Sequence, residues 1–362
     1  MTITNPAKRI VVIGGVDTHK DTHTAAALDD NGRLLSVSEF PASASGYREL
    51  YRWFEKLGDL ESIGIEGTGS YGAGLARHLR TLGVRVLEVS CPNRQLRRRR
   101  GKSDPVDAEA AARAVLSGQA LGVPKSQDGA VEAMRLLRTE RRSAIKARTQ
   151  ATNQIHATIS TAPETVCARF TGRTVRAIVD VAGAFRIVDP TASLDAMTRY
   201  VLRGLAKRWQ ALNGEVGRLD KVLAQMVDEL VPALVSEPGV GPEVASALLV
   251  AVGDNPERLA NEASFAALCG VSPVDASSGR QRRHRLNRGG NRDANRALWV
   301  IAFVRMRCDP RTKAYVAKRT EQGLSRPEIL RCLKRYIARA LFRKLHPLAA
   351  KAASGVHQPK AA

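Results

Sequence analysis

The first 126 residues alternate between patterns typical of buried strands and of amphipathic helices. The apolar run RIVVIGGVDTH (9–19) predicts a buried strand, and HTAAALDDNGRLLSVSEF (23–40) predicts a hairpin that turns at Asn31 and Gly32. A helix, a strand, a helix and a strand are then predicted over 45–58, 62–70, 71–83 and 84–90. An antiparallel three-stranded start followed by alternating helices and strands predicts a mixed α/β domain over 8–126.

Beyond about residue 128 the pattern becomes that of long polar helices. Residues 130–159 and 194–230 carry apolar side chains at helical spacing and flank a less regular stretch, 160–200, to which we assign no role. We expect an antiparallel coiled-coil hairpin over 127–232 that acts as a spacer or in oligomerisation. A solvated helix pair without a partner is the alternative.

The remaining chain is predicted to be a mainly α-helical domain over 233–350, with 351–362 as a disordered tail. It opens with PGVGPEVASALLVAVGD (238–254), a helix-hairpin-helix-like turn. Backbone N–H groups at such a turn suit a phosphate, so Gly239 and Gly241 are candidates for binding nucleic acid. A plain tight turn between two helices is the alternative.

The charge balance indicates a polyanionic partner. The chain has 57 Lys and Arg against 35 Asp and Glu, a formal net charge of +22. Residues 270–362 alone hold 22 basic and 5 acidic residues, or +17, which favours nucleic acid over an anionic membrane surface, the alternative. No apolar run approaches membrane-spanning length, the start MTITNPAKRI lacks a signal-peptide core, and the five cysteines lack C-x-x-C spacing. We therefore expect a cytoplasmic protein with reduced thiols.

Four acids are candidates for chemistry. In RRRRGKSDPVDAEAAARA (97–114), Asp104 suits a helix N-cap and Pro105 the first helical position, but Asp104 and Asp107 also share one helical face and can face one ion. Asp17 and Glu66 each stand at the end of a predicted strand, in GVDTHK and GIEGTGSYG. If the four converge at one sheet edge, they can hold two divalent ions, Mg²⁺ or Mn²⁺, for phosphodiester chemistry. Ordinary turn and capping roles are the alternative.

The ordered set GVDTHK, GIEGTGSY and GKSDPVDAEAAARA resembles the DEDD transposases of insertion-sequence family one-hundred-and-ten. This resemblance implies a first domain with a RuvC-like, RNase H-like fold. It also implies that Asp17, Glu66, Asp104 and Asp107 are the catalytic metal ligands. The adjacent basic run can guide a nucleic-acid backbone to the metal site, which makes its residues candidates for nucleic-acid binding: Arg97, Arg98, Arg99, Arg100 and Lys102.

The stretch PVDASSGRQRRHRLNRGGNRDANRALW resembles the C-terminal transposase domain of the same family. The resemblance implies that Ser278, next to Gly279, is a covalent nucleophile on DNA, with Ser277 as its rival. From the residues alone, a serine in such a loop is an ordinary turn residue. Neighbouring arginines can stabilise developing phosphate charge, and His284 is a candidate proton carrier. The basic candidates here are Arg280, Arg282, Arg283, Arg285 and Arg288.

The resemblance further implies donor and target DNA as substrates, and a noncoding bridge RNA as the guide. It implies a composite site in which the acids of one subunit meet the serine of another, within a dimer that pairs into a tetramer. A bacterial, nucleoid-associated location follows from those partners. Two other functions stay open: a structure-specific junction endonuclease that uses only the acids, and a non-catalytic architectural protein that binds nucleic acid.

Overall fold

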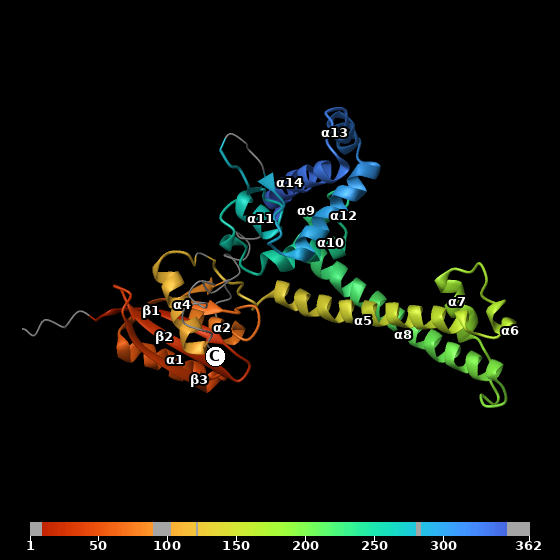
Figure 1. The fold of residues 1–362 in the computed structure, drawn as a ribbon, viewed down its shortest axis with the longest axis horizontal. Coiled ribbons are helices and arrows are strands. Elements are labelled where there is room, and N and C mark those ends of the chain that lie inside the picture. The colour runs from red at the N-terminus through yellow and green to blue at the C-terminus, as the bar shows by residue number, and fades with distance from the viewer. Residues whose placement is uncertain (1–8, 90–102, 121, 280–283, 346–362) are drawn as a thin grey trace, which may run out of the picture. The chain divides into compact units, whose positions relative to one another are not determined.

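The computed structural model describes residues 9–89, 103–120, 122–279 and 284–345. The chain forms two compact units, one of residues 9–129 with 252–261 and one of residues 130–251 with 262–345 (Figure 1). Several predicted features lie outside the described residues: the tail 351–362, Arg97, Arg98, Arg99, Arg100, Lys102, Arg280, Arg282 and Arg283.

The first unit is built on a five-stranded mixed sheet with the strand order β3-β2-β1-β4-β5. β1 pairs antiparallel with β2 and parallel with β4, β2 pairs antiparallel with β3, and β4 pairs parallel with β5. The mixed α/β prediction is therefore confirmed. The strands are β1 (Val11–Thr18), β2 (Thr22–Asp29), β3 (Leu34–Pro41), β4 (Asp59–Glu66) and β5 (Arg85–Val89).

The predicted hairpin turn lies between β2 and β3. Gly32 has a positive φ of 81°, which glycine adopts without strain. The Asp29 carboxylate accepts hydrogen bonds from the backbone N–H groups of Asn31 and Arg33 and so fixes the turn. Local side-chain chemistry thus decides where the first strands reverse.

Helices cover both faces of this sheet (Figure 1). α1 (Ala44–Leu57) and α2 (Ala73–Thr81) pack on one face, with Phe54 among the buried side chains. α4 (Asp104–Leu116) packs on the other face. Because both faces are covered, the central strands are apolar in continuous runs, as the sequence indicated.

A short segment distant in sequence, 252–261, completes the first unit. The Asn255 side chain accepts a hydrogen bond from the Ser126 backbone N–H and donates one to the Pro124 carbonyl. Arg258 donates to the Val123 carbonyl. These contacts satisfy the backbone of an extended stretch that meets the sheet in a single antiparallel bridge, between Gly122 and Glu88 of β5.

The second unit contains a long antiparallel helix pair, α5 (Ala130–Ser160) and α8 (Leu194–Leu230) (Figure 1). Three cross-pairs show the direction: Arg141 with Asp220, Arg148 with Asn213, and Thr152 with Trp209. The pair ends in a small core beneath α6 (Glu164–Cys167) and α7 (Val175–Gly183), in which Phe170 and Phe185 pack edge to face. The less regular stretch between the two long helices thus forms a small helical cap at the end of the α5–α8 pair.

The rest of the second unit is mainly helical, with one short two-stranded ribbon. Its elements are α9 (Pro232–Val235), α10 (Pro242–Val252), α11 (Glu262–Leu268), β6 (Val274–Asp275), β7 (His284–Arg285), α12 (Arg292–Cys308), α13 (Pro310–Glu321) and α14 (Arg326–Leu345). A 3-10 turn (Pro256–Arg258) lies in the segment that joins the first unit. Within the described part, no helix has the length and apolar character needed to cross a membrane.

Candidate active site

Asp17 and Glu66 lie at the carboxyl ends of two neighbouring parallel strands. β1 and β4 pair up to Val16 and Ile65, and the two acids are the next residue on each strand. The Thr18 hydroxyl donates a hydrogen bond of 2.8 Å to the Glu66 carbonyl, which ties the two strand ends together. Ligands in such sheets gather at the carboxyl ends of strands, so this edge is suited to a site.

The helix α4 brings the other two acids to the same edge. Its N-cap is Ser103, whose carbonyl accepts the first helical hydrogen bond from the Asp107 N–H. The prediction that Asp104 is the N-cap is therefore wrong by one residue, and Pro105 takes the second helical position rather than the first. Asp104 is already helical, so its carboxylate is not needed to cap the helix.

Glycine at position 15 lets α4 approach β1 closely. A Cβ on Gly15 would lie 2.2 Å from the Ala108 carbonyl oxygen and 2.2 Å from the Ala112 nitrogen. Gly64 on β4 makes similar close contact with Ala111 and Val115. The run of alanines in α4 and the two glycines thus seat the helix directly on the sheet and set the height of Asp104 and Asp107.

The acids converge around His19. The His19 Nε2 lies 3.3 Å from an Asp17 carboxylate oxygen and 3.4 Å from an Asp104 carboxylate oxygen. One potential ligand atom from each of these three residues falls within 4.8 Å of the others. A cavity of about 270 Å³ is lined by Asp17, His19, Glu66 and Asp107 among others. All four predicted acids therefore belong to one constellation.

The electrostatics of this constellation favour a cation. Burial raises the pKa of Asp17, and the neighbouring charges of Asp104 and Asp107 raise it further, while His19 lowers it. Crowded carboxylates of this kind repel one another unless a positive charge lies between them. An all-oxygen donor set from three elements suits Mg²⁺ or Mn²⁺, so the residues fit a divalent ion.

Sequence reasoning did not single out His19. Its position two residues after Asp17, just beyond the end of a strand, was the available signal. Histidine is not a preferred ligand of hard cations, so its place between two carboxylates is better suited to neutralising them or to carrying a proton.

The predicted serine lies in the second unit, on the loop between β6 and β7. The two serines differ in their contacts. The Ser277 hydroxyl donates a 2.5 Å hydrogen bond to Asp275, which lowers the pKa of Asp275. Ser278 is exposed, and its hydroxyl takes part in no hydrogen bond within the described residues. Ser278 is thus the hydroxyl accessible to a ligand.

The base of the serine loop is held firmly. A Cβ on Gly290 would lie 2.6 to 2.8 Å from backbone atoms of Ala267, Leu268 and Gly270, so only glycine fits there. The Asn295 side chain donates to the carbonyls of Cys269 and Gly270. The loop therefore leaves and rejoins the helices at one fixed point.

The other predicted nucleic-acid contacts have different surroundings. Arg285 and Arg288 are exposed on and after β7. Gly239, with a φ of 82°, lies against α12, where a Cβ would come within 3.3 Å of Ile301 and Val304. Gly241 is exposed with open space around it. Packing therefore accounts for Gly239, and Gly241 is the accessible member of the turn.

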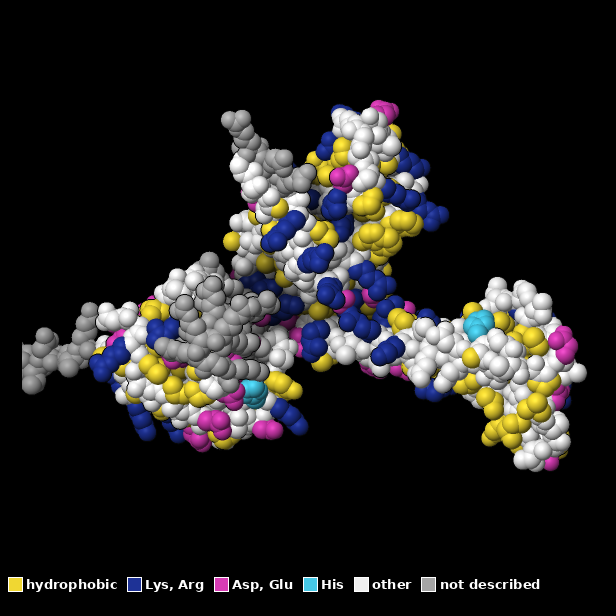
Figure 2. Space-filling view, viewed as in Figure 1, with side chains coloured by type: hydrophobic (Ala, Val, Ile, Leu, Met, Phe, Trp, Pro, Cys, Tyr) yellow, Lys and Arg dark blue, Asp and Glu magenta, His cyan; other side chains and the backbone are white. Residues whose placement is uncertain are grey.

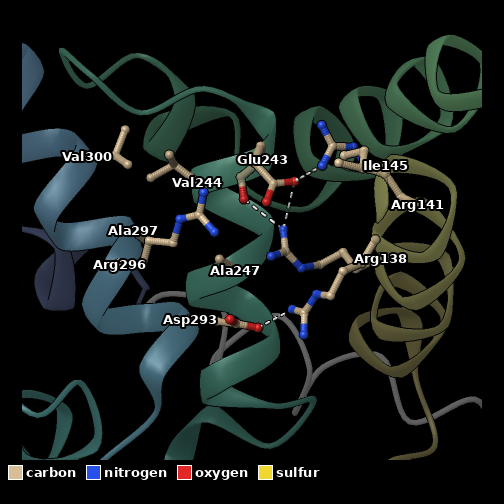
Figure 3. Close-up of a pocket in the computed structure, with 11 residues that line it drawn as sticks. Arg138, Arg141, Ile145, Glu243, Val244, Ala247, Asp293, Arg296, Ala297 and Val300 are labelled. Carbon is tan, nitrogen blue, oxygen red and sulfur yellow. Dashed lines mark hydrogen bonds and ion pairs between the residues drawn. The ribbon is translucent and has the colours of Figure 1, made fainter. Parts of the chain in front are cut away.

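An arginine-rich cavity of about 290 Å³ lies where α5, α10 and α12 meet (Figure 3). Arg138 is buried and donates to the Glu243 carbonyl and the Ser246 hydroxyl. Arg141 pairs with Glu243, and Arg142 with Asp293. Figure 3 shows these ion pairs crossing between helices. Local patterns do not reveal this cluster, because its members come from three helices that are distant from one another in the sequence.

Lys and Arg side chains are dense over the C-terminal helices of the second unit (Figure 2). That distribution agrees with the concentration of positive charge in residues 270–362. It is the kind of surface that contacts phosphate backbones.

Two family models match this chain. Residues 14–162 match the DEDD model of IS110, described as Transposase, and residues 231–317 match the model described as Transposase IS116/IS110/IS902 family. The first match spans all four acids and the second spans both serines.

Individual relatives come from insertion elements. The 43.6 kDa protein of IS110 from Streptomyces coelicolor is 32% identical over 162 residues, covering 44% of this chain and 39% of that protein. A mini-circle protein of the same organism, assigned as the transposase for IS117, is 24% identical over 372 aligned positions, covering 87% of this chain and 89% of that protein. The 42 kDa protein of IS900 from Mycobacterium paratuberculosis is 27% identical, covering 42% of this chain and 41% of that protein. The chain thus spans about two fifths of the IS110 and IS900 proteins and nearly all of the IS117 protein.

Proposed function

We propose that this chain, a member of the IS110 family of transposases, cleaves DNA strands and joins them to new partners as the transposase of an insertion sequence. The observation that carries the proposal is that Asp104 lies beside Asp17 and His19, and that these last two line one cavity with Glu66 and Asp107. We further propose an RNase H-like, RuvC-like fold for the first unit, supported by its mixed sheet and by the helix that carries two acids to the strand ends.

In the proposed mechanism, Asp17, Glu66, Asp104 and Asp107 would hold a pair of divalent ions, Mg²⁺ or Mn²⁺. Such ions, when bound, supply an activated oxygen nucleophile and stabilise a leaving oxyanion. The chain's own contribution is to fix the carboxylates: β1 and β4 present two of them, and α4, seated against Gly15, presents the others. His19 bridges Asp17 and Asp104 and is placed to move a proton at either carboxylate.

Ser278 is proposed as the covalent nucleophile. Its exposed hydroxyl can reach a DNA phosphate, whereas the Ser277 hydroxyl is engaged by Asp275. Attack of the Ser278 oxygen on phosphorus forms the serine O–P bond and breaks the P–O bond to one sugar oxygen. The serine proton passes to a base or solvent, and the released sugar oxygen takes up a proton to become a hydroxyl strand end. The phosphoserine keeps the bond energy needed to rejoin strands. Exposed Arg285 and Arg288 are suited to stabilise phosphate charge near this loop.

The proposed substrates are donor and target DNA, with a noncoding bridge RNA as the guide, in the bacterial cytoplasm. In such a system base pairing reads sequence while the protein contacts the backbone. The basic surface of the C-terminal helices supports such contact with the nucleic-acid backbone (Figure 2).

We also propose that the protein is a homo-oligomer, a dimer that pairs into a tetramer. The helix pair α5 and α8 is proposed as a coiled-coil assembly element. Apolar side chains are exposed near the start of α8, and they support this role: Leu194, Met197, Tyr200 and Val201.

The test uses purified protein with RNA from the element's flank, donor and target DNA, and Mg²⁺. Wild type, Asp104→Asn and Ser278→Ala are compared for recombinant product and for protein–DNA adducts on a denaturing gel. We expect product and adduct from wild type and neither from the two variants.

Two matched controls sharpen the test. Glu49→Gln removes an exposed acid of the first unit, and Ser277→Ala removes the neighbouring hydroxyl. Both are expected to keep product and adduct. Cleavage that survives Ser278→Ala without an adduct would show the junction-nuclease function instead, and activity that survives Asp104→Asn would refute the metal site.

A further inference from the structure

A second basic cavity, of about 560 Å³, lies beside the serine loop, and Arg285 is the one residue of its lining that the mechanism above uses. One side is formed by β7 and the residues around it, including His284 and Arg285. The other side is formed by α14, through Arg331, Lys334 and Arg335. β7, which pairs with β6 at the base of the serine loop, therefore also borders this cavity.

The positive charge in the cavity has little acidic compensation. Glu328 is the acidic residue in the lining, and its carboxylate accepts hydrogen bonds from the backbone and hydroxyl of Ser325 at the start of α14. It lies 3.9 Å from Arg331, too far for a direct hydrogen bond. The cavity therefore has an excess of cationic groups over carboxylates.

Lys334 is held in a partly desolvated position. Its Nζ donates to the Asn295 side chain, which in turn binds the carbonyls at the base of the serine loop. Burial lowers the pKa of Lys334, and so does the neighbouring charge of Arg331. A lysine held there by an amide, and not by a carboxylate, keeps its attraction for an anion.

Arg335 shows an incomplete set of contacts. One guanidinium nitrogen, Nη2, lies 3.2 Å from Glu262. The other, Nη1, is buried and has no hydrogen-bond partner among the described residues. A buried guanidinium N–H without an acceptor is costly, and a bound anion would supply one.

An aromatic ring lies in the same lining. Tyr336 is 52% exposed, and Tyr315 supports it edge to face with a centroid distance of 5.7 Å. A fixed and exposed ring beside cationic groups suits a nucleotide, because the base can stack while the phosphate meets the cations.

We propose that this cavity binds one nucleotide of a nucleic-acid strand next to the serine loop, with Arg331, Lys334 and Arg335 on its phosphodiester and Tyr336 against its base or sugar. The inference rests on the proposed function, because a strand held here is positioned for the Ser278 hydroxyl. Arg331, Lys334 and Arg335 are thus positioning residues. DNA and RNA share the phosphodiester, so the experiment has an arm for each.

The experiment measures binding of the full-length protein to a fluorescent DNA strand and to its RNA counterpart, in EDTA, over a series of salt concentrations. Each phosphate contact contributes roughly 0.7 to 0.9 to the slope of log K against log salt. Lys334→Gln and Arg331→Gln are expected to lower that slope by about 1 each, whereas Lys334→Arg keeps it. The matched control Arg343→Gln removes an exposed charge from the same helix outside the cavity and leaves the slope close to that of wild type.

A local readout separates this site from the rest of the basic surface. Cys332 lines the cavity, and Cys308 is exposed at the end of α12. Saturating nucleic acid is expected to slow alkylation of Cys332 relative to Cys308, as measured by peptide mass spectrometry.

If Lys334→Gln lowers the salt slope for the DNA strand, the cavity binds DNA. If it lowers the slope for the RNA strand, the cavity binds RNA. Either result supports the proposal. Equal slopes for Lys334→Gln and Arg343→Gln on both strands would overturn it, as would alkylation of Cys332 at an unchanged rate. Because no metal is present and no cleavage is scored, failure of the recombination reaction leaves this result readable by itself.

Discussion

The carboxylate of Asp17 is buried at the end of β1 and shares its surroundings with those of Asp104 and Asp107. Burial and like charge both raise its pKa above the ordinary value of 3.8. Between 3.8 and the raised pKa, the folded state keeps a proton that the unfolded state releases. The free energy of unfolding therefore falls as pH rises through that window, and it stays lowered at neutral pH. The site thus costs stability until a cation occupies it.

Asp17→Asn removes that cost, because an amide carries no charge. Without metal at neutral pH, we expect the variant to melt at a higher temperature than wild type, and to lose the fall in stability that Asp17 causes as pH rises above 3.8. Added Mg²⁺ is expected to stabilise wild type through binding but to leave Asp17→Asn nearly unchanged. Thermal unfolding in EDTA and in Mg²⁺ at several pH values checks this. A melting temperature for Asp17→Asn below that of wild type in EDTA would contradict the crowding argument.

Single residues also mark the limit of sequence reasoning. The four acids were found because their motifs resemble a family, and the structure gathers them. His19 was missed because no local pattern distinguishes a histidine between two carboxylates from one on a solvated turn. The difference between Ser277 and Ser278 also depends on a hydrogen bond to Asp275, which spacing alone does not reveal.

At the scale of elements, the strands and helices of the first 89 residues match the predicted order because each carries its own period of apolar residues. The long helices α5 and α8 begin and end within a residue of the prediction. What the sequence did not reveal is contact between distant segments: the docking of 252–261, the arginine cavity, and the seat of α4 on Gly15. Those contacts depend on tertiary packing, which the spacing of apolar residues within one segment does not indicate.

Gly15→Ala tests the close packing of α4 against β1. The new methyl group would meet backbone atoms of Ala108 and Ala112, so the helix must move away from β1. We expect a loss of about 1–3 kcal/mol in unfolding free energy, and weaker Mg²⁺ stabilisation because Asp104 and Asp107 move with the helix. Denaturant unfolding with and without Mg²⁺ measures both. As a control, Gly204→Ala on α8 meets no neighbour and is expected to stabilise by roughly 0.5–1 kcal/mol. If Mg²⁺ stabilises Gly15→Ala as much as wild type, the close packing of α4 against β1 does not position the acids.

Arg138→Met tests the contact between α5 and α10. The substitution removes donors to the Glu243 carbonyl and the Ser246 hydroxyl, while Arg141 still pairs with the Glu243 carboxylate. We expect a loss of about 2–3 kcal/mol, because the buried Ser246 hydroxyl loses a charged donor. Arg135→Met, which breaks an exposed pair with Glu132, is expected to cost less than about 1 kcal/mol. Equal losses in the two variants, measured by denaturant unfolding, would show that burial of Arg138 adds nothing.

At the scale of the whole molecule, the acids and the serine belong to different compact units. A reaction that needs both requires the units to meet, within one chain or between chains. The apolar side chains near the start of α8 give the second possibility a physical basis, because exposed apolar groups at helical spacing suit a partner helix (Figure 2).

Replacing Met197 and Val201 together by Glu tests that contact. Both side chains are exposed, so the change costs the folded chain little, but it places charge in a proposed interface. We expect the double variant to shift from oligomer to monomer in light scattering while its melting temperature at low protein concentration stays close to that of wild type. The control Lys207→Glu, exposed on the same helix, is expected to keep the oligomer. An unchanged mass for the double variant would place the interface elsewhere.

Mixing two inactive variants tests whether the site is shared between subunits. Asp104→Asn keeps the serine and Ser278→Ala keeps the acids, so each chain supplies what the other lacks. If the acids of one subunit act with the serine of its partner, co-expressed variants assemble some complete sites, about a quarter of the total for random pairing of equal amounts. Recombinant product and adduct are then expected from the mixture, with the adduct carried only by the Asp104→Asn chain, which mass spectrometry can identify. A site formed within one chain gives no product from the mixture, because every chain then lacks either an acid or the nucleophile.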